Sequence, residues 1–178
     1  MNNFFKQEIL TDRFILRPLD IKDVTKHYAD WLSDETTSKY ISARLSLIKL
    51  RHYVADRSNR DDVLFLGIFN KTNGSHIGNI KYEPIQFESR QATMGILIGE
   101  KEWRGKGVAS EVIIASAIAL NERLKIEKII LGVNKDNSSA IRAYEKIGFK
   151  KKSSFNNSHQ MQLDLKKLII FKVKKDEL

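Results

Sequence analysis

Short apolar runs, separated by polar and turn-forming residues, dominate the first hundred positions of the chain, and such runs are typical of β-strands. Asn73-Gly74 lies between two of these runs and favours the left-handed backbone of a hairpin turn. The pattern therefore predicts an antiparallel meander. Its strands are expected at residues 14–19, 63–69, 76–84 and 93–98.

Two segments with helical spacing interrupt this meander after its first strand. Asp20, with Asp23 three residues later, resembles a capping box that opens a helix from Ile21 to Leu32. Ser46 can cap a second helix, in which apolar residues again recur at helical spacing. The expected apolar faces are Ile21, Val24, Tyr28 and Trp31 in the first helix, and Leu47, Leu50 and Val54 in the second.

The second half of the chain alternates helices with strands. The run from Val108 to Leu124 is apolar around most of its circumference, which predicts a helix buried against a sheet. Asn137 can cap a shorter helix, Ser138 to Ile147, and Gly148 can end it in the left-handed conformation. Further strands are expected at residues 128–133, 149–152 and 159–165. This order predicts an α/β (α+β) fold with one right-handed crossover.

Length and composition indicate one domain. A chain of 178 residues with 42% hydrophobic content suits a single core, so we expect one domain over residues 1–178, with a basic C-terminal extension at 166–178. The absence of cysteine excludes disulfides and thiolate chemistry. No apolar run reaches the roughly 18 residues of a membrane span, and residues 1–10 do not resemble a signal peptide. We expect a cytoplasmic protein, in which the final Lys-Asp-Glu-Leu is a coincidence rather than a retention signal.

The chain is basic, with a formal net charge of +9 from 31 basic and 22 acidic residues. Such an excess can serve nucleic acid, an anionic membrane or a phosphorylated ligand. Residues 149–178 contain eight lysines and three acidic residues, so much of the excess positive charge belongs to the C-terminal part. A solvated lysine-rich face explains this part without a partner. A basic module that binds RNA or ribosomes without catalysis remains the alternative interpretation of the chain.

The stretch "EWRGKGVASEV", residues 102–112, places two glycines directly before the buried helix. A P-loop would need Ser or Thr after the lysine, but Gly107 follows Lys106. A dinucleotide fingerprint would need a strand running into the first glycine and an acidic residue about 20 positions later, and the sequence has neither in place. Backbone N–H groups from Arg104 to Ala109, unpaired at a helix start, still favour a pyrophosphate.

Two motifs in register carry a family resemblance. Arg104-Gly105-Lys106-Gly107-Val108-Ala109 resembles the Arg/Gln-x-x-Gly-x-Gly/Ala signature of the GNAT acetyltransferases. The segment "NSSAIRAYEKIGF" resembles the Asn-x-x-Ala-x-x-x-Tyr-x-x-x-Gly-Phe segment of the same family, at Asn137, Ala140, Tyr144, Gly148 and Phe149. The N-terminal "LTDRFILRPLDIKDV" resembles the ribosomal-protein N-terminal acetyltransferase branch. The resemblance covers nearly the whole chain and is weakest after residue 165.

The family resemblance implies a single GNAT-like domain with a mixed, mostly antiparallel sheet of about six to seven strands and helices on both faces. It also implies acetyl-CoA as co-substrate, with the pyrophosphate on the glycine turn. The pantetheine arm would pair with strand 93–98 where that strand separates from strand 128–133, and Asn137 would position the thioester. The cofactor-binding residues expected on this basis are Ile96, Leu97, Ile98, Arg104, Gly105, Lys106, Gly107, Val108, Ala109, Asn137 and Arg142. No metal is expected, because the four histidines show no metal-ligand spacing.

Tyr144 shares a helix face with Ala140, Ile141 and Ile147, which by itself indicates core packing. The family resemblance instead implies a general acid, since a phenol with a pKa of about 10 is protonated at pH 7 and can donate to the departing CoA thiolate. The attacking amine must lose its own proton. Glu83 on a strand and Glu100 in a loop are candidate bases, although the sequence favours a surface carboxylate at both positions and assigns no base. No Ser/His/Asp order is suggested by the motifs, so direct attack in a ternary complex is expected rather than a covalent intermediate.

The predicted function is transfer of the acetyl group of acetyl-CoA to a primary amine by a monomer or homodimer. The branch resemblance favours a protein N-terminal amine, and a small amine such as an amino sugar fits equally well. The sequence leaves the acceptor open, because acceptor contacts would come from loops such as Lys39–Ser46 and Glu83–Gln91. Neither a membrane nor nucleic acid is an expected partner.

Overall fold

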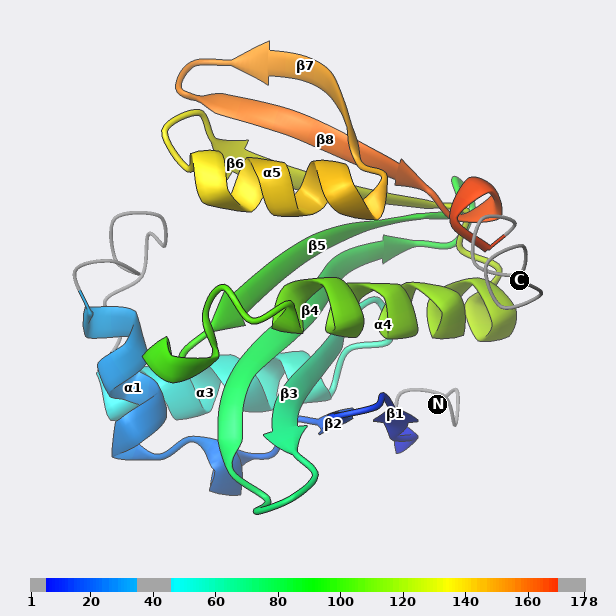
Figure 1. The fold of residues 1–178 in the computed structure, drawn as a ribbon. Coiled ribbons are helices and arrows are strands. Elements are labelled where there is room, and N and C mark those ends of the chain that lie inside the picture. The colour runs from blue at the N-terminus through cyan, green and yellow to red at the C-terminus, as the bar shows by residue number, and fades with distance from the viewer. Residues whose placement is uncertain (1–5, 35–45, 170–178) are drawn as a thin grey trace.

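The computed structural model describes residues 6–34 and 46–169, and their strands form one eight-stranded sheet (Figure 1). The strand order is β1-β2-β3-β4-β5-β6-β8-β7, and all neighbours are antiparallel except β5 and β6. The expected mixed sheet is confirmed, with slightly more strands than predicted. The strands are β1 Ile9–Leu10, β2 Phe14–Pro18, β3 Leu64–Asn70, β4 His76–Gln86, β5 Gln91–Ile98, β6 Lys128–Asn134, β7 Lys150–Phe155 and β8 Ser158–Asp164.

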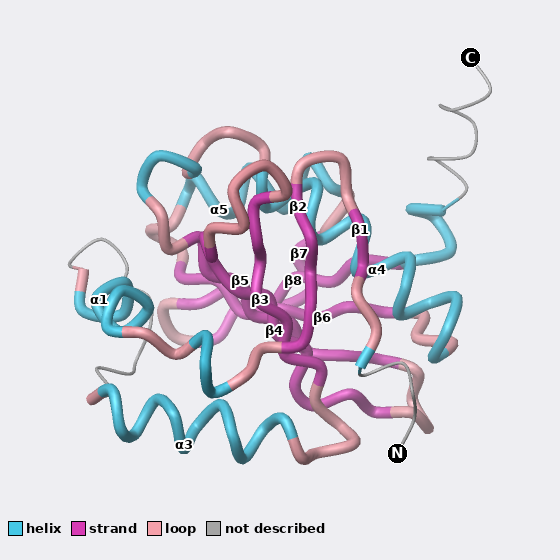
Figure 2. Tube along the Cα trace, turned by 90° about the horizontal axis from the view of Figure 1, so that it is seen from below, coloured by secondary structure: helices cyan, strands magenta, loops and turns pink. Residues whose placement is uncertain are grey.

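Helices cover both faces of the sheet. Helices α4 (Val108–Leu124) and α5 (Ser138–Ile147) lie on one face, and both have the bounds that the sequence predicts. Helices α1 (Lys26–Ser33) and α3 (Leu47–Ser58) lie on the other, as Figure 2 shows from below. The larger core fills the space between the sheet and α4, where the buried Tyr82 hydroxyl lies 2.7 Å from Ser116 Oγ. A smaller core lies under α1 and α3.

The start of the first helix differs from the prediction. The capping box of Asp20 and Asp23 is present, but it opens a 3₁₀ turn at Ile21–Asp23. The α-helix begins only at Lys26, because the Thr25 side chain accepts from the backbone N–H of residue 28 and provides a second cap. Ile21 is consequently 47% exposed, so its expected burial is wrong, whereas the other three residues of the predicted face are buried.

The parallel pair β5 and β6 is joined along only part of its length. Residues Gln91–Thr93 pair with Lys128–Ile130. Beyond these positions β5 keeps β4 as its neighbour and β6 keeps β8, and the two strands separate toward their carboxyl ends. In Figure 1 the ribbons of β5 and β6 diverge in the direction of the start of α4. This separation positions the candidate site.

The C-terminal part forms the edge of the sheet. β8 lies beside β6, and β7 is the outermost strand, exposed along its whole length. The expected strand at residues 159–165 ends at Asp164, because residues 165–169 form a helical turn. Two predicted segments lie wholly or largely outside the described residues. They are residues 170–178 of the expected extension and most of the expected acceptor loop Lys39–Ser46.

Candidate functional site

The turn between β5 and α4 contains two glycines in the left-handed region, with φ +74° at Gly105 and +77° at Gly107. Gly107 is the N-cap of α4 and has no side chain to cap the helix. The N–H of Glu111 makes the first helical bond, to the Gly107 carbonyl at 3.2 Å. The N–H groups of Val108, Ala109 and the next residue therefore precede the helical hydrogen bonds, and this uncapped helix start can receive an anion.

Arg104 does not contribute to this turn in the expected way. Its N–H donates to the Lys101 carbonyl at 3.1 Å in the preceding 3₁₀ turn, η3 (Lys101–Trp103), so the prediction of a free N–H at Arg104 is wrong. Its guanidinium donates to the carbonyls of Ile98 (3.0 Å) and Gly99 (2.8 Å) and also reaches Asp34 (3.3 Å). The Arg104 side chain thus fixes the end of β5 and ties it to the end of α1.

Arg13, which the sequence reasoning missed, braces the glycine turn from the N-terminal strands. Its Nη2 donates to the Lys106 carbonyl at 3.0 Å, and its Nε donates to Glu111 in the first turn of α4 at 2.7 Å. Burial acts to raise the pKa of Glu111, but hydrogen bonds from Thr11 and Arg13 outweigh it and lower that pKa. The contact joins residues far apart in sequence, and a single arginine before a strand gives no signal of it.

Open space adjoins the separated parts of β5 and β6. A Cβ placed at Gly95 of β5 or at Gly132 of β6 would meet no atom within 4 Å. The backbone of Ile96, Leu97 and Ile98 belongs to the separated part of β5, as the family resemblance requires, although the Ile98 carbonyl already accepts from Arg104. Their contact with a pantetheine arm stays a prediction.

Asn137 is the N-cap of α5, and the hydrogen bonds of this cap leave only one side-chain group of Asn137 for a ligand. Its Oδ1 accepts from the N–H of Ala140 at 3.2 Å and from the hydroxyl of Ser139 at 3.1 Å. An amide oxygen has two lone pairs, so Nδ2 is the atom left to donate to a ligand carbonyl. Arg142, also expected at the cofactor, is exposed on the same helix.

Tyr144 lies on α5 and packs against the larger core, with its ring centroid 5.6 Å from that of Phe149. Burial raises the pKa of Tyr144 to about 12. No hydrogen bond from its hydroxyl to another residue occurs within the described parts of the chain. The phenol is therefore protonated at neutral pH and carries the proton that a general acid must donate.

Glu83 lies in a strand and is surrounded by cations. Its carboxylate accepts from Lys81 (2.5 Å), Arg57 (3.0 Å) and Arg60 (2.8 Å). Burial acts to raise the pKa of Glu83, but Lys81 and Arg57 outweigh it and lower that pKa, which makes the carboxylate a weak base. The loop expected at Glu83–Gln91 is shorter than predicted and spans only residues 87–90, because β4 continues to Gln86 and β5 begins at Gln91.

Glu100, the other candidate base, follows the separated end of β5. Its Oε1 accepts from Trp31 Nε1 at 3.0 Å and also contacts His27 Nε2. The Trp31 ring packs directly on Gly99, where a Cβ would lie 2.0 Å from it. Glu100 is thus held between α1 and β5 at the edge of the separated region.

No helix among the described residues is long and apolar enough to cross a membrane, and these residues contain no cluster of His, Asp or Glu suited to a metal.

The fold is an α/β domain in which one parallel strand pair separates at one end, beside the uncapped, glycine-preceded start of α4. Residues 13–150 match the Acetyltransferase (GNAT) domain family, and the chain belongs to this family of acetyl-CoA-dependent N-acetyltransferases. The chain is 24% identical over 169 residues to an N-acetyltransferase 9-like protein of Caenorhabditis briggsae, covering 89% of this chain and 85% of that one.

Solved structures of similar fold include two from Vibrio cholerae. A spermidine N-acetyltransferase in complex with CoA and spermine has a TM-score of 0.79 and 20% identity, covering 88% of this chain and 98% of that one. A putative ribosomal-protein-serine acetyltransferase has a TM-score of 0.74 and 14% identity, covering 89% and 97%. At 20% and 14% identity, both likenesses show the fold alone.

Proposed function

We propose that this N-acetyltransferase moves the acetyl group from acetyl-CoA to a primary amine by direct attack, with both substrates bound together. The single observation that supports this best is the separation of β5 from β6 beyond residues 93 and 130, next to the uncapped start of α4. The pyrophosphate would lie on the glycine turn, and the thioester arm would extend from there between the two strands.

Each bond change has a group to assist it. The amine nitrogen attacks the thioester carbon from the face of the sheet opposite α4, the new C–N bond forms, and the C–S bond breaks. The amide Nδ2 of Asn137 would orient the arm, and the Tyr144 hydroxyl would protonate the departing thiolate. The phenol regains a proton from solvent after product release.

The amine must lose one proton, and we propose that water accepts it. Glu83 already binds three cations, so its carboxylate is poorly suited to take up a proton. Glu100 lies nearer the separated end of β5, but it accepts from Trp31 and contacts His27. A water-mediated path needs no single carboxylate.

We propose a protein N-terminal amine or a small amine such as an amino sugar as the acceptor, rather than a polyamine. Lys81 is the register partner of Gly95, so its side chain shares a face with the open space beside that glycine. Lys81 and Arg57, held at Glu83, would repel a polycation there. The likeness to a spermidine acetyltransferase concerns the fold, since identity is only 20%.

An acceptor panel tests this proposal. Release of the free CoA thiol is measured with N-terminal peptides, an amino sugar and spermidine, each varied against acetyl-CoA. We expect release with a peptide or amino sugar and intersecting initial-velocity lines, as a ternary complex requires. Spermidine as the best acceptor would overturn the acceptor proposal. RNA binding that collapses with rising salt, without thiol release from any amine, would instead support a binding module.

A further inference from the structure

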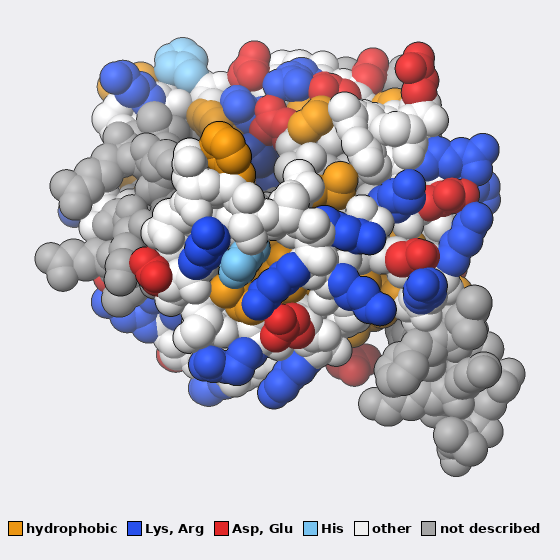
Figure 3. Space-filling model, turned by 90° about the horizontal axis from the view of Figure 1, so that it is seen from above, with side chains coloured by type: hydrophobic (Ala, Val, Ile, Leu, Met, Phe, Trp, Pro, Cys, Tyr) orange, Lys and Arg blue, Asp and Glu red, His pale blue; other side chains and the backbone are white. Residues whose placement is uncertain are grey.

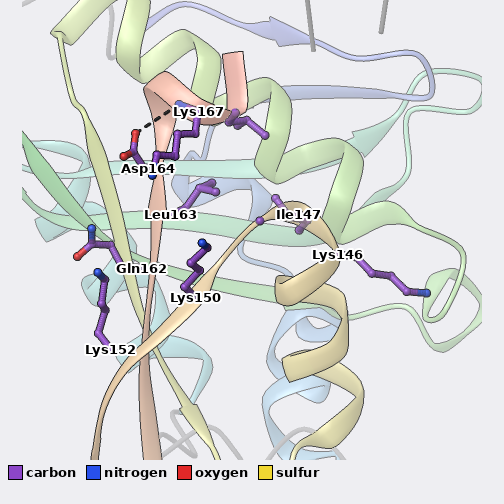
Figure 4. Close-up of a pocket in the computed structure, with 10 residues that line it drawn as sticks. Lys146, Ile147, Lys150, Lys152, Gln162, Leu163, Asp164 and Lys167 are labelled. Atoms are coloured by element: carbon purple, nitrogen blue, oxygen red, sulfur yellow. Dashed lines mark hydrogen bonds between the residues drawn. The ribbon is translucent and has the colours of Figure 1, made fainter. Parts of the chain in front are cut away.

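A lysine-rich hollow lies far from the glycine turn, where α5 ends, β7 begins and the helical turn 165–169 follows β8 (Figure 4). Its volume is about 370 Å³. Asp164, in its wall, is the register partner of Lys128, which belongs to the paired end of β6. The hollow is therefore at the end of the sheet opposite the separation of β5 and β6, and it is distinct from the acetyl-CoA site.

The wall of the hollow carries an uncompensated positive charge. Lys150, Lys152 and Lys167 line it, and none of them forms an ion pair with a residue in the described ranges. Asp164 is the one carboxylate among the lining residues, and its Oδ1 accepts from the backbone N–H of Lys167 at 3.3 Å. The lysine ammonium groups thus remain available to an anion.

Neighbouring lysines outside the hollow behave differently. Lys151 is paired with Glu145 at 3.6 Å, and Lys166 is paired with Glu127 at 3.2 Å. Neither lysine lines the hollow. The lysines that line the hollow therefore differ from these two neighbours, whose charges are already paired.

Backbone geometry contributes to this arrangement. The register of β7 with β8 shifts between Lys151 and Ser153, so Lys152 stands outside regular pairing, and such bulges redirect a side chain. In Figure 4, Lys150 and Lys152 lie beside Gln162, whereas Lys146 extends away from them. Figure 3, seen from above, shows Lys and Arg side chains gathered on the face that carries β7, β8 and α5.

Apolar side chains also line the hollow. Ile147, Leu163 and Leu168 are 6%, 2% and 8% exposed. We propose that the hollow is a second ligand site, which binds a small molecule carrying a phosphate group on an apolar or ring portion. A lysine ammonium is a compact charge suited to phosphate, and the volume lies within the roughly 300–1,000 Å³ of small-molecule sites. Nucleic acid would instead need a groove that follows its backbone.

Phenyl phosphate is a direct probe, because it combines a ring with one phosphate. Amide signals in ¹H–¹⁵N spectra of the whole protein are followed during its titration, with excess CoA present to occupy the glycine turn. We expect saturable shifts confined to residues 147–152 and 162–168, and weaker binding of inorganic phosphate. The double variant Lys150→Gln/Lys152→Gln should bind phenyl phosphate roughly tenfold or more weakly, since it loses two charge-assisted contacts.

Lys151→Gln is the matched control, because it removes the same charge from the same strand outside the hollow. We expect it to leave affinity within about twofold of the unaltered protein, since long-range charge effects are screened by salt. Shifts that do not saturate, or an equal loss in both variants, would contradict a built site. Tighter binding of a single-stranded oligonucleotide, with a steep salt dependence, would show a nucleic-acid surface instead.

Discussion

At the residue scale, Tyr144 joins a packing role to a chemical one. We predict that Tyr144→Phe lowers turnover by roughly 10²- to 10⁴-fold, the range for a positioned proton donor, while acetyl-CoA affinity stays nearly unchanged. The ring remains in place against Phe149, so only the proton is lost. Steady-state kinetics and calorimetry measure the two effects. Full turnover in a folded Phe variant would rule out the acid role.

The raised pKa of Tyr144 gives a stability control. The folded pKa is about 12, whereas the unfolded value is about 10, so the unfolded chain loses this proton first as pH rises. The contribution of Tyr144 to the free energy of unfolding is therefore complete below about pH 10 and falls between about pH 10 and 12. The Phe variant should lack this component in denaturant titrations.

Glu83 leads to a prediction of modest change. We expect that neither Glu83→Gln nor Glu100→Gln abolishes thiol release, because water can carry the proton of the amine. Glu83→Gln should also lower stability, since Lys81, Arg57 and Arg60 lose a partly buried charged partner. The measurement is the rate of thiol release, corrected for the folded fraction of each variant. A loss of rate beyond about a thousandfold in either variant would identify that glutamate as the base.

At the element scale, Arg13 connects the N-terminal strands to the start of α4. Arg13→Gln should weaken acetyl-CoA binding about tenfold, because the Lys106 carbonyl and Glu111 lose the group that holds the turn. Arg90→Gln is a matched control, since Arg90 also pairs with a glutamate, Glu127, at 3.0 Å. Calorimetric titration with CoA compares the two. Equal affinities in both variants would show that Arg13 does not position the turn.

Elements with strong local signals were predictable. α4 and α5 have apolar periodicity and glycine or asparagine at their ends, and their bounds match the structure. β1 has only two residues and was not predicted, and β7, "KKKSSF", was predicted only in its first half, by the strand expected at 149–152, because it is exposed throughout and lacks a hydrophobic pattern. These strands form because partners pair with them, which no local pattern reveals.

At the scale of the whole molecule, the site depends on long-range contacts. The glycine turn was visible in sequence, because positive φ and a helix start need glycine there. The separation of β5 from β6 came only from family resemblance, since both strands have ordinary apolar patterns. Three contacts of the site can be predicted only from the folded structure. They are the attachment of Arg104 to β5, the contacts of Arg13 with the glycine turn, and the cations around Glu83. Sequence thus predicted the elements of the site better than its contacts.

CoA binding by two glycine variants tests the central claim most directly. Gly107 and Gly74 have nearly the same left-handed φ, +77° and +71°, and Gly74 lies in the hairpin between β3 and β4. Substitution by Val strains the backbone at both positions, at a cost of order 1–3 kcal/mol. Only Gly107→Val also places a branched side chain where the pyrophosphate would approach.

Calorimetry on the folded fraction of each variant should show CoA affinity reduced roughly tenfold or more in Gly107→Val and unchanged in Gly74→Val. Unchanged affinity in a folded Gly107→Val protein, or an equal loss in both variants, would contradict pyrophosphate binding at the start of α4.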